Sequence, residues 1–330
     1  MTGGAGYVGS HSAKALSRAG HRVVVFDNLS AGHREAALGA PLIEEDVRDV
    51  DAVRRAIRES GASAVMHFAA SLDVASSVRD PAAYYRNNVV GSLATLEAMV
   101  AEGCRQFVFS STCAVYGEPV ELPLGETHPT SPVSAYGQTK LAVEQALPHF
   151  ERAYGIRSIR LRYFNAAGAD PEGELGEDHT PEVHVIPRAI AAAFDGPPFE
   201  LFGEDYQTPD GTCQRDYVHV ADLADAHVRA LARLEAGGAS ATYNVGTERP
   251  ASVREVLAAV EGVVGRPVVR RTAPRRAGDA AALYAAASRI REDLGWVPQR
   301  PSLEEIVADA WRWHSTHPHG FRVPARRGGG

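Results

Sequence analysis

The chain has 330 residues, of which 45% are hydrophobic and 23% charged, and its formal net charge is −7. Such a composition is typical of a globular protein with one large domain or two smaller ones, and the acidic balance disfavours nucleic acid as a partner. The three cysteines lack metal-ligand spacing, which indicates a reducing compartment. Because we see no signal peptide and no apolar run long enough to cross a bilayer, we expect a cytoplasmic protein with no membrane partner.

A glycine-rich turn, T-G-G-A-G-Y-V-G, occupies residues 2–9 and leads into a helical pattern. Glycines let the backbone approach a pyrophosphate, and the N-terminus of a helix offers unpaired N–H groups to it. The turn predicts dinucleotide binding by Gly3, Gly6 and Gly9.

A turn of this kind should follow a first strand, yet only Met1 and Thr2 precede its glycines. We interpret this as a start codon that lies upstream or as a truncated chain, and favour the upstream start. If the chain begins at Met1, we expect an empty position at the centre of the sheet, with consequences for stability and cofactor binding.

An acidic residue, Asp27, ends the strand expected at residues 22–26, about 20 residues beyond the glycines. A carboxylate there hydrogen-bonds the adenosine ribose and repels a 2′-phosphate, which favours NAD over NADP. The alternative is a plain turn residue.

Residues 42–48 are expected to form a strand and then a turn, and a further strand is expected at residues 63–68. Asp46 and Val47, after the first, either flank the adenine or form an ordinary turn. Small residues after the second strand would let the cofactor pass close by, whereas His67 within it is expected to be a packed strand residue. Helical residues 84–100 follow, in which Asn87 either reaches the cofactor or is solvated.

The central stretch combines strand-end hydroxyls with a tyrosine–lysine pair. An apolar strand at 107–109 precedes Ser110 and Thr112, and a helix is expected from Ser134 onward. Tyr136 and Lys140 then lie one turn apart on the same face. A phenol has a pKa of about 10, and a nearby cation, together with a nicotinamide ring, favours the phenolate, so Tyr136 is predicted to be a general base.

Lysine usage supports this interpretation, because Lys14 and Lys140 are the only lysines although lysine and arginine together number 34. Arginine cannot substitute well at such a site, since its charge is delocalised. Pro148 is expected to kink or end the helix.

Alternating strands and helices up to a strand at 157–165 predict a doubly wound parallel sheet. Composition changes near Ala169, and residues 183–193 and 199–203 begin a smaller unit. A strand at 242–245 is expected to return to the large sheet. The basic cluster at 270–276 is either a solvated face or a phosphate site, and the glycines at 328–330 are expected to be a frayed tail. We predict no metal site, because the histidines at 314, 317 and 319 lack further ligands.

With T-G-G-A-G-Y-V-G, S-S-T-C-A-V-Y-G, S-A-Y-G-Q-T-K, R-Y-F-N-A-A-G and R-D-Y-V-H-V in one order, the chain resembles the extended short-chain dehydrogenase/reductases. The segment F-G-E-D-Y-Q-T-P-D-G-T-C-Q-R-D-Y-V-H-V is similar to those members that epimerise nucleotide sugars. The resemblance implies an α/β fold, a Rossmann-type doubly wound parallel sheet with a smaller interleaved C-terminal α/β domain. Residues 1–168, with 216–249 returning, would bind NAD, and residues 169–215 and 250–330 would bind the nucleotide sugar.

The family's functional residues fall on matching positions of this sequence. The implied catalytic residues are Tyr136, Lys140 and Thr112. The implied cofactor-binding residues are Gly3, Gly6, Tyr7, Val8, Gly9, Asp27, Asn28, Asp46, Val47, Phe68, Ala69, Ala70, Asn87, Ser110, Tyr136, Lys140 and Tyr163. The implied substrate-binding residues are Thr112, Tyr136, Asn165, His184, Val185, Phe202, Arg215, Tyr217, Arg276, Asp279 and Leu283.

The implied function is reversible 4-epimerisation of UDP-glucose and UDP-galactose through a 4-keto intermediate, with tightly bound NAD. Alternatives are a 4-epimerase of UDP-N-acetylhexosamine or UDP-pentose, or an NAD-binding homologue that is non-catalytic or truncated. Related dehydratases carry an Asp-Glu pair where this chain has Cys113 and Ala114, which argues against dehydration. Leu283 is smaller than the family's bulky aromatic residue, so N-acetylated sugars are expected to fit. The family also implies a homodimer, in which Leu93, Leu96 and Met99 belong either to the interface or to the core.

Overall fold

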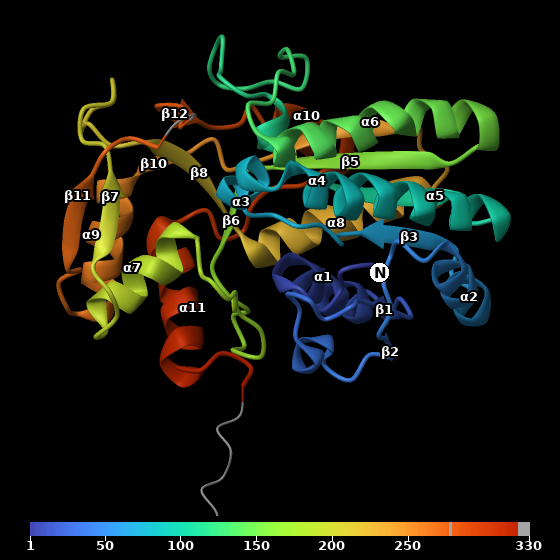
Figure 1. The fold of residues 1–330 in the computed structure, drawn as a ribbon, viewed down its shortest axis with the longest axis horizontal. Helices are drawn as coiled ribbons and strands as arrows, with labels where there is room; N and C mark the ends of the chain where they lie inside the picture. Colours follow the sequence, from blue (N-terminus) through green and yellow to red (C-terminus); the bar gives the residue numbers. More distant parts are fainter. Residues whose placement is uncertain (277–278, 323–330) are drawn as a thin grey trace, which may run out of the picture.

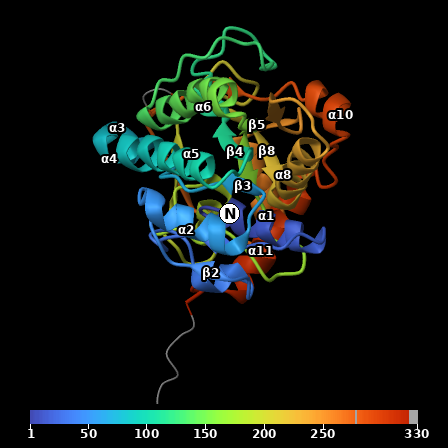
Figure 2. The same cartoon turned by 90° about the vertical axis from the view of Figure 1, so that its right-hand side faces the viewer.

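A parallel sheet forms the larger part of the molecule, which is described here from a computed structural model covering residues 1–276 and 279–322 (Figures 1 and 2). Its continuous part has the order β3-β4-β5-β9, and all neighbours are parallel. A parallel pair, β1-β2, lies on the other side of Thr2. The strands are β1 (Val25–Phe26), β2 (Leu42–Ile43), β3 (Ala64–His67), β4 (Gln106–Thr112), β5 (Arg157–Tyr163) and β9 (Ala241–Val245).

Helices cover both faces of this sheet, which confirms the predicted doubly wound arrangement. One apolar cluster joins the sheet to α1 (Tyr7–Arg18), α8 (Val220–Glu235) and α10 (Ser288–Leu294). A second cluster joins it to α2 (Val50–Ser60), α5 (Gly91–Ala101) and α6 (Ala135–Tyr154). Short turns connect these elements: η1 (Arg34–Ala37), α3 (Val74–Arg79), α4 (Pro81–Tyr84), the π-helical η2 (Tyr85–Val90) and η3 (Cys113–Val115).

A smaller unit has its own apolar core between helices and short strands. Strand β8 pairs with β6, β10 and β12, and β7 pairs with β11. The strands are β6 (Asn165–Ala167), β7 (Phe199–Phe202), β8 (Gln214–His219), β10 (Pro250–Ser252), β11 (Arg270–Ala273) and β12 (Ala282–Leu283). The helices are α7 (Val185–Ala193), α9 (Val253–Val264) and α11 (Leu303–Thr316). Because β9 pairs with β5 of the large sheet, as predicted, the chain passes from this unit back to the first one before returning.

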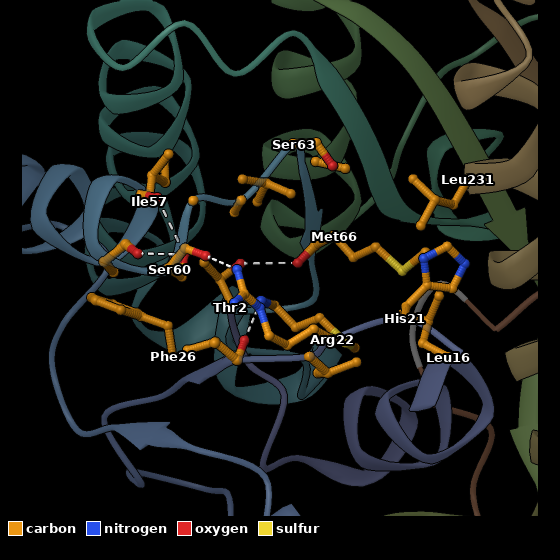
Figure 3. Close-up of a pocket in the computed structure, with 18 of the residues that line it drawn as sticks. Thr2, Leu16, His21, Arg22, Phe26, Ile57, Ser60, Ser63, Met66 and Leu231 are labelled. Carbon is orange, nitrogen blue, oxygen red and sulfur yellow. Dashed lines mark hydrogen bonds between the residues drawn. The ribbon is translucent and has the colours of Figure 1, made fainter. Parts of the chain in front are cut away.

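The central position of the large sheet is occupied by Thr2, which bridges Phe26 and His67 in parallel fashion. The Thr2 N–H donates to Met66 O at 3.0 Å, and Phe68 N–H donates to Thr2 O at 2.8 Å. The rest of the central strand position, on the side of Met1 away from the glycine-rich turn, is a cavity of about 250 Å³. Figure 3 shows this cavity between Phe26, Met66 and the surrounding side chains. The central strand position, which we expected to be empty, is therefore occupied by Thr2 at its carboxyl end. The backbone hydrogen bonds of Thr2 place the glycine-rich turn at the edge of the sheet.

Two local expectations are wrong. Pro148 does not end the helix, because α6 runs from Ala135 to Tyr154. The strand expected at 157–165 ends at Tyr163, and Asn165 begins β6, which pairs with β8 instead.

Among the described residues, no helix is both long and apolar enough to cross a membrane. The glycines at 328–330, expected to form a tail, lie outside the described residues.

Candidate functional site

The tyrosine–lysine pair lies at the carboxyl end of β4. Ser134 caps the start of α6 by accepting from Gly137 N–H at 3.1 Å, which fixes where the helix begins. One turn inside the helix, the Lys140 ammonium donates to the backbone carbonyl of Ser110 at 2.8 Å. Lys140 is only 3% exposed, so the helix and the strand hold its charge in the interior.

Burial dominates the ionisation of both partners. Burial lowers the pKa of Lys140 to about 7, against an opposing effect of Glu144. Burial also raises the pKa of Tyr136, and Tyr163 adds to this, while a hydrogen bond from Thr112 acts in the opposite direction. In the protein alone, burial thus keeps the pKa of Tyr136 above its usual value. The lowering expected from Lys140 together with the nicotinamide ring stays a prediction.

Neighbouring hydroxyls complete this corner. Tyr163 of β5 lies in register with Thr112 of β4, and its hydroxyl is 2.6 Å from the Ser110 hydroxyl. The Thr112 hydroxyl accepts from Ala114 N–H at 3.1 Å, which orients it at the strand end. The structure thus brings together five residues to which the resemblance assigns a function: Ser110, Thr112, Tyr136, Lys140 and Tyr163.

A buried ion pair behind the site was not found from the sequence. The guanidinium of Arg162 on β5 binds the Glu144 carboxylate of α6 at 2.5 Å, and the Ser111 hydroxyl donates to the same carboxylate at 2.5 Å. The Arg162 guanidinium also donates to the Tyr116 hydroxyl at 3.1 Å. Glu144 lies one turn beyond Lys140, which is the only signal in the sequence that could have indicated it.

The glycine-rich turn fits a dinucleotide. A Cβ at Gly3, whose φ is +69°, would lie 2.4 Å from Ala69 N, and one at Gly9 would lie 2.2 Å from Gly3 O. Gly6 is the N-cap residue of α1, and because glycine has no side chain it cannot cap the first N–H groups of the helix. The Tyr7 hydroxyl donates to Gly168 O at 2.7 Å, and Val8 packs on the core. Such a close-packed turn before a helix can bind a pyrophosphate.

Asp27 is buried beside this turn. Its carboxylate accepts from Ala5 N–H and Leu29 N–H, each at 2.9 Å, so it holds the turn in place; burial raises its pKa. Asn28 donates to the Asp46 carboxylate at 3.2 Å. That carboxylate also binds Arg48, which lowers the pKa of Asp46 to about 2, and the adjacent Val47 is buried.

The residues after β3 adjoin the same turn. Phe68 packs against the ring of His227 at 4.7 Å, and Ala69 N–H donates to Thr2 O before the chain continues to Ala70. The Asn87 amide donates to the Ser71 hydroxyl at 3.2 Å from the π-helical η2, a geometry frequent at functional sites. His67 is fully buried between Thr2 and Ser92, in agreement with a packed strand residue.

The predicted substrate residues of the smaller unit form a second group. Arg215 on β8 pairs in register with Leu283 on β12, and its guanidinium lies 3.6 Å from the Asp279 carboxylate. Arg276 donates to the same carboxylate at 2.8 Å and covers the ring of Phe202 at 4.9 Å.

Two further predicted substrate residues, Asn165 and Tyr217, lie in register on β6 and β8. Tyr217 is buried, and its hydroxyl has no hydrogen-bond partner within the part of the chain that the structure describes. His184 differs, because its imidazole contacts the carboxylates of Glu177 and Glu182, while Val185 begins α7.

Comparisons with known proteins agree with this geometry. The model of the NAD dependent epimerase/dehydratase family matches residues 1–246. A curated UDP-glucose 4-epimerase from Rhizobium leguminosarum bv. trifolii is 50% identical over 316 residues, which cover 96% of this chain and 96% of that protein.

Two crystal structures are similar over almost the whole chain. UDP-glucose 4-epimerase from Brucella ovis in complex with NAD is 46% identical with a TM-score of 0.92, covering 94% of this chain and 96% of that one. UDP-glucose 4-epimerase from Bifidobacterium longum in complex with NAD⁺ and UDP is 35% identical with a TM-score of 0.91, covering 97% and 98%. On the strength of a family match over most of its length and of these relatives, the chain belongs to the NAD dependent epimerase/dehydratase family.

Proposed function

We propose that this chain is an NAD-dependent enzyme that interconverts UDP-glucose and UDP-galactose by 4-epimerisation. The observation that carries the proposal is the corner at the carboxyl end of β4, where the half-buried Tyr136 lies beside the buried Lys140 and Thr112. Family membership and the UDP-glucose 4-epimerases that match nearly the full chain give it further support.

The chain's own residues would manage a proton at the sugar 4′-oxygen. Tyr136 takes the proton from the 4′-hydroxyl and returns it after the sugar has turned over as a 4-keto intermediate. Thr112 hydrogen-bonds the same oxygen, and Lys140 favours the phenolate. NAD, when bound, supplies the chemistry of accepting hydride from C4′ and giving it back to the opposite face. Because burial raises the pKa of Tyr136, the base has to be activated by charge that arrives with the ligands.

The cofactor would lie along the carboxyl edge of the large sheet. We assign the pyrophosphate to the turn of Gly3, Gly6 and Gly9 and the adenosine ribose to Asp27, whose carboxylate already fixes that turn. The remaining cofactor residues predicted from the resemblance stay as assigned, with the NAD-binding domain at residues 1–168 and 216–249.

The nucleotide sugar would be held mainly through UDP. Arg215 and Arg276 converge on Asp279 and present two guanidinium groups that fit a diphosphate. Binding energy placed there leaves the hexose free to rotate between the two hydride transfers. These residues belong to the proposed substrate domain, residues 169–215 and 250–330.

The proposal extends to assembly and location. We infer a homodimer through α5, α6 and the adjoining η2, on which the side chains of Tyr85 and Val90 are exposed. Leu96 and Met99, considered for this interface from the sequence, lie in the core instead. We also propose a cytoplasmic location, which the free cysteines support because they suit a reducing compartment.

The test is direct conversion of UDP-galactose by the purified protein in the presence of NAD, with products separated by anion-exchange chromatography. We expect a stable mixture of UDP-galactose and UDP-glucose from either starting sugar. If neither sugar is converted although NAD binds, the chain is a cofactor-binding homologue and not an epimerase.

A further inference from the structure

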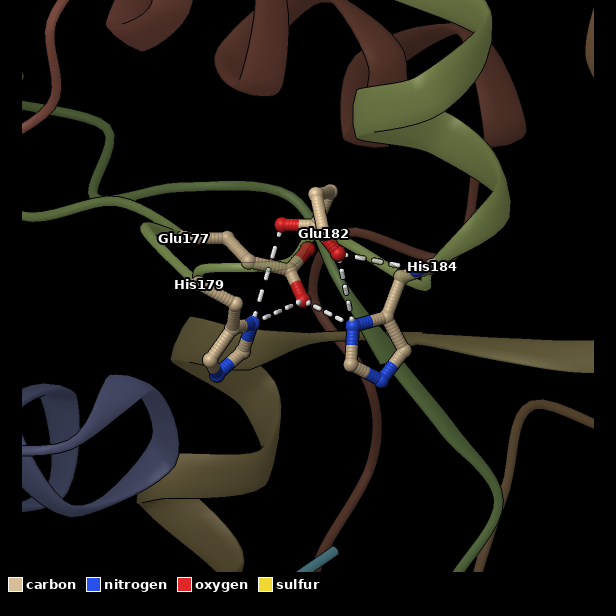
Figure 4. A group of neighbouring side chains, drawn as sticks. All are labelled: Glu177, His179, Glu182 and His184. Atoms are coloured by element: carbon tan, nitrogen blue, oxygen red, sulfur yellow. Dashed lines mark hydrogen bonds and ion pairs between the residues drawn. The ribbon is translucent and has the colours of Figure 1, made fainter. Parts of the chain in front are cut away.

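Four metal-ligating side chains converge in the segment before α7. Glu177, His179, Glu182 and His184 each contribute one donor atom, and these four atoms lie within 4.8 Å of one another (Figure 4). The His184 Nδ1 atom lies 2.6 Å from Glu177 Oε1 and 3.1 Å from Glu182 Oε1. The His179 Nδ1 atom lies 3.3 Å from Glu177 Oε1 and 3.6 Å from Glu182 Oε2.

Of these four contacts, only that between His184 Nδ1 and Glu182 Oε1 is a hydrogen bond, and the other three are not. The Glu177 side chain is only 4% exposed, yet its Oε1 atom has no hydrogen-bond partner among the described residues, and neither has His179 Nδ1. Glu177 Oε1 and His179 Nδ1 therefore approach their neighbours without the alignment that a shared proton requires. A buried carboxylate oxygen of this kind is costly unless a cation satisfies it, and that cation is either a protonated imidazole of His179 or His184 or a bound metal ion.

The spacing matches a small coordination sphere. A tetrahedral ion with bonds of about 2.0–2.2 Å sets its donor atoms about 3.3–3.6 Å apart. The distances between imidazole and carboxylate atoms here run from 2.6 to 3.6 Å, so one ion would fit after a slight outward movement of the side chains.

We propose that Glu177, His179, Glu182 and His184 bind one divalent transition-metal ion of the Zn²⁺ type. Two neutral imidazoles and two carboxylates give a ligand set whose charge balances that of the ion, and mixed nitrogen and oxygen donors suit zinc. The Glu182 carboxylate is already oriented, since Oε1 accepts from the N–H groups of Val183 and His184, each at 2.8 Å. Such hydrogen bonds to a ligand preorganise a metal site.

A second cluster of carboxylates in the chain differs, because a lysine of the protein neutralises its charge. Asp170, Glu172 and Glu174 surround the Lys14 ammonium at 2.6, 3.1 and 2.6 Å. A cation of the chain itself fills that cluster, so it needs no ion. Within the described residues, the cluster at 177–184 has no lysine or arginine ion pair of this kind.

The position of the site indicates a structural role. His184 is the N-cap residue of α7, and no side chain caps that helix. The ring of His179 stands edge-on to Tyr7 of α1, with ring centroids 6.3 Å apart. A bound ion would therefore fix the loop at 177–184 between α1 and α7.

The experiment is metal analysis of the full-length protein after removal of metals with a chelator, incubation with ZnCl₂ and gel filtration. We expect about one zinc per chain by plasma mass spectrometry, and a fall of at least ten-fold for Glu177→Gln and for His184→Gln. Glu174→Gln is the matched control, because it removes the same charge from the cluster filled by Lys14 and should keep the zinc. Wild-type protein that retains no zinc, or variants that retain as much as wild type, would overturn the proposal.

A spectroscopic measurement guards against misfolding of the variants. Wild-type protein loaded with Co²⁺ should show the visible absorption of a tetrahedral ion with nitrogen and oxygen donors, and one equivalent of Zn²⁺ should abolish it. Absence of this absorption in folded wild-type protein contradicts the site, whatever the variants do.

Discussion

Lys140 carries a charge that the fold disfavours. Burial lowers its pKa to about 7, whereas a lysine in an unfolded chain titrates at about 10.4. Between these two values the unfolded chain binds more protons than the native protein, so the contribution of Lys140 to the free energy of unfolding rises with pH. Below pH 7 both states are protonated, and the contribution is constant.

We therefore expect the free energy of unfolding of wild type, minus that of Lys140→Met, to rise between about pH 7 and 10. The rise should be at most about 1.4 kcal/mol per pH unit. Urea titrations of the cofactor-free protein at several pH values measure it. The other lysine gives the control: its carboxylate partners outweigh burial and raise the pKa of Lys14, so Lys14→Met should show no such growth. A difference for Lys140→Met that stays constant up to pH 10 would show that the ammonium is hydrated.

Tyr136 is the residue on which the proposed chemistry depends most. Removing its hydroxyl in Tyr136→Phe should lower kcat by about 10²- to 10⁴-fold, the usual contribution of a general base. NAD should stay bound, because the phenol is one of many groups near the cofactor; absorbance of the released nucleotide after denaturation measures this. Near-normal turnover of UDP-galactose by the variant would exclude Tyr136 as the base.

At the scale of elements, the pair of Glu144 and Arg162 joins α6 to β5 behind the strand that carries Thr112. Both side chains are almost fully buried, so removing one charge leaves the other without compensation. We expect Glu144→Gln to lower the free energy of unfolding by about 3 kcal/mol, measured by urea denaturation. Glu97→Gln, on the exposed side of α5, removes the same charge and should have little effect. Equal effects of the two variants would mean that the pair is not what stabilises α6.

Strand β12 bears on the choice of sugar. Leu283 pairs in register with Arg215, one of the proposed diphosphate ligands, so its side chain is close to the proposed substrate site. Because leucine is smaller than an aromatic residue, we expect wild-type protein to convert UDP-N-acetylglucosamine as well. Leu283→Tyr should lose that activity and keep conversion of UDP-galactose, measured by chromatography of both reactions. No conversion of the N-acetylated sugar by wild type, even at high enzyme concentration, would contradict this.

An element could be predicted from the sequence when the residues that determine it are neighbours along the chain. The glycine-rich turn, β4 and the start of α6 were predictable because glycines, apolar runs and a capping serine act on their own neighbours. The continuation of α6 past Pro148 was not predictable, since the effect of a proline depends on which face of the helix meets water. Asn165 begins β6 only because β8 lies beside it. The group at 177–184 comes from one short segment with neither helical nor strand periodicity, so its convergence depends on the loop conformation, which the sequence pattern did not predict.

At the scale of the whole molecule, one buried carboxylate links the two units. Asp216 on β8 accepts from Thr247 N–H at 2.8 Å, Glu248 N–H at 3.1 Å and Ala285 N–H at 3.2 Å. Thr247 follows β9 of the large sheet, whereas Ala285 follows β12 of the small one. Because Arg215 is adjacent to Asp216, the same contact that joins the units places the proposed diphosphate ligand relative to the catalytic corner.

Assembly is the property of the whole molecule that the proposed function leaves to be measured. Val90 on η2 is 50% exposed, next to α5 and α6, where we infer the dimer interface. A glutamate there would place an unpaired charge in an apolar contact, which costs several kcal/mol. We expect wild type to be a dimer by gel filtration with light scattering and Val90→Glu to be a monomer. Val297 is 51% exposed and lies between α10 and α11, so Val297→Glu is a matched control that should remain dimeric. A monomeric wild type, or dissociation by both substitutions alike, would contradict an interface through α5 and α6.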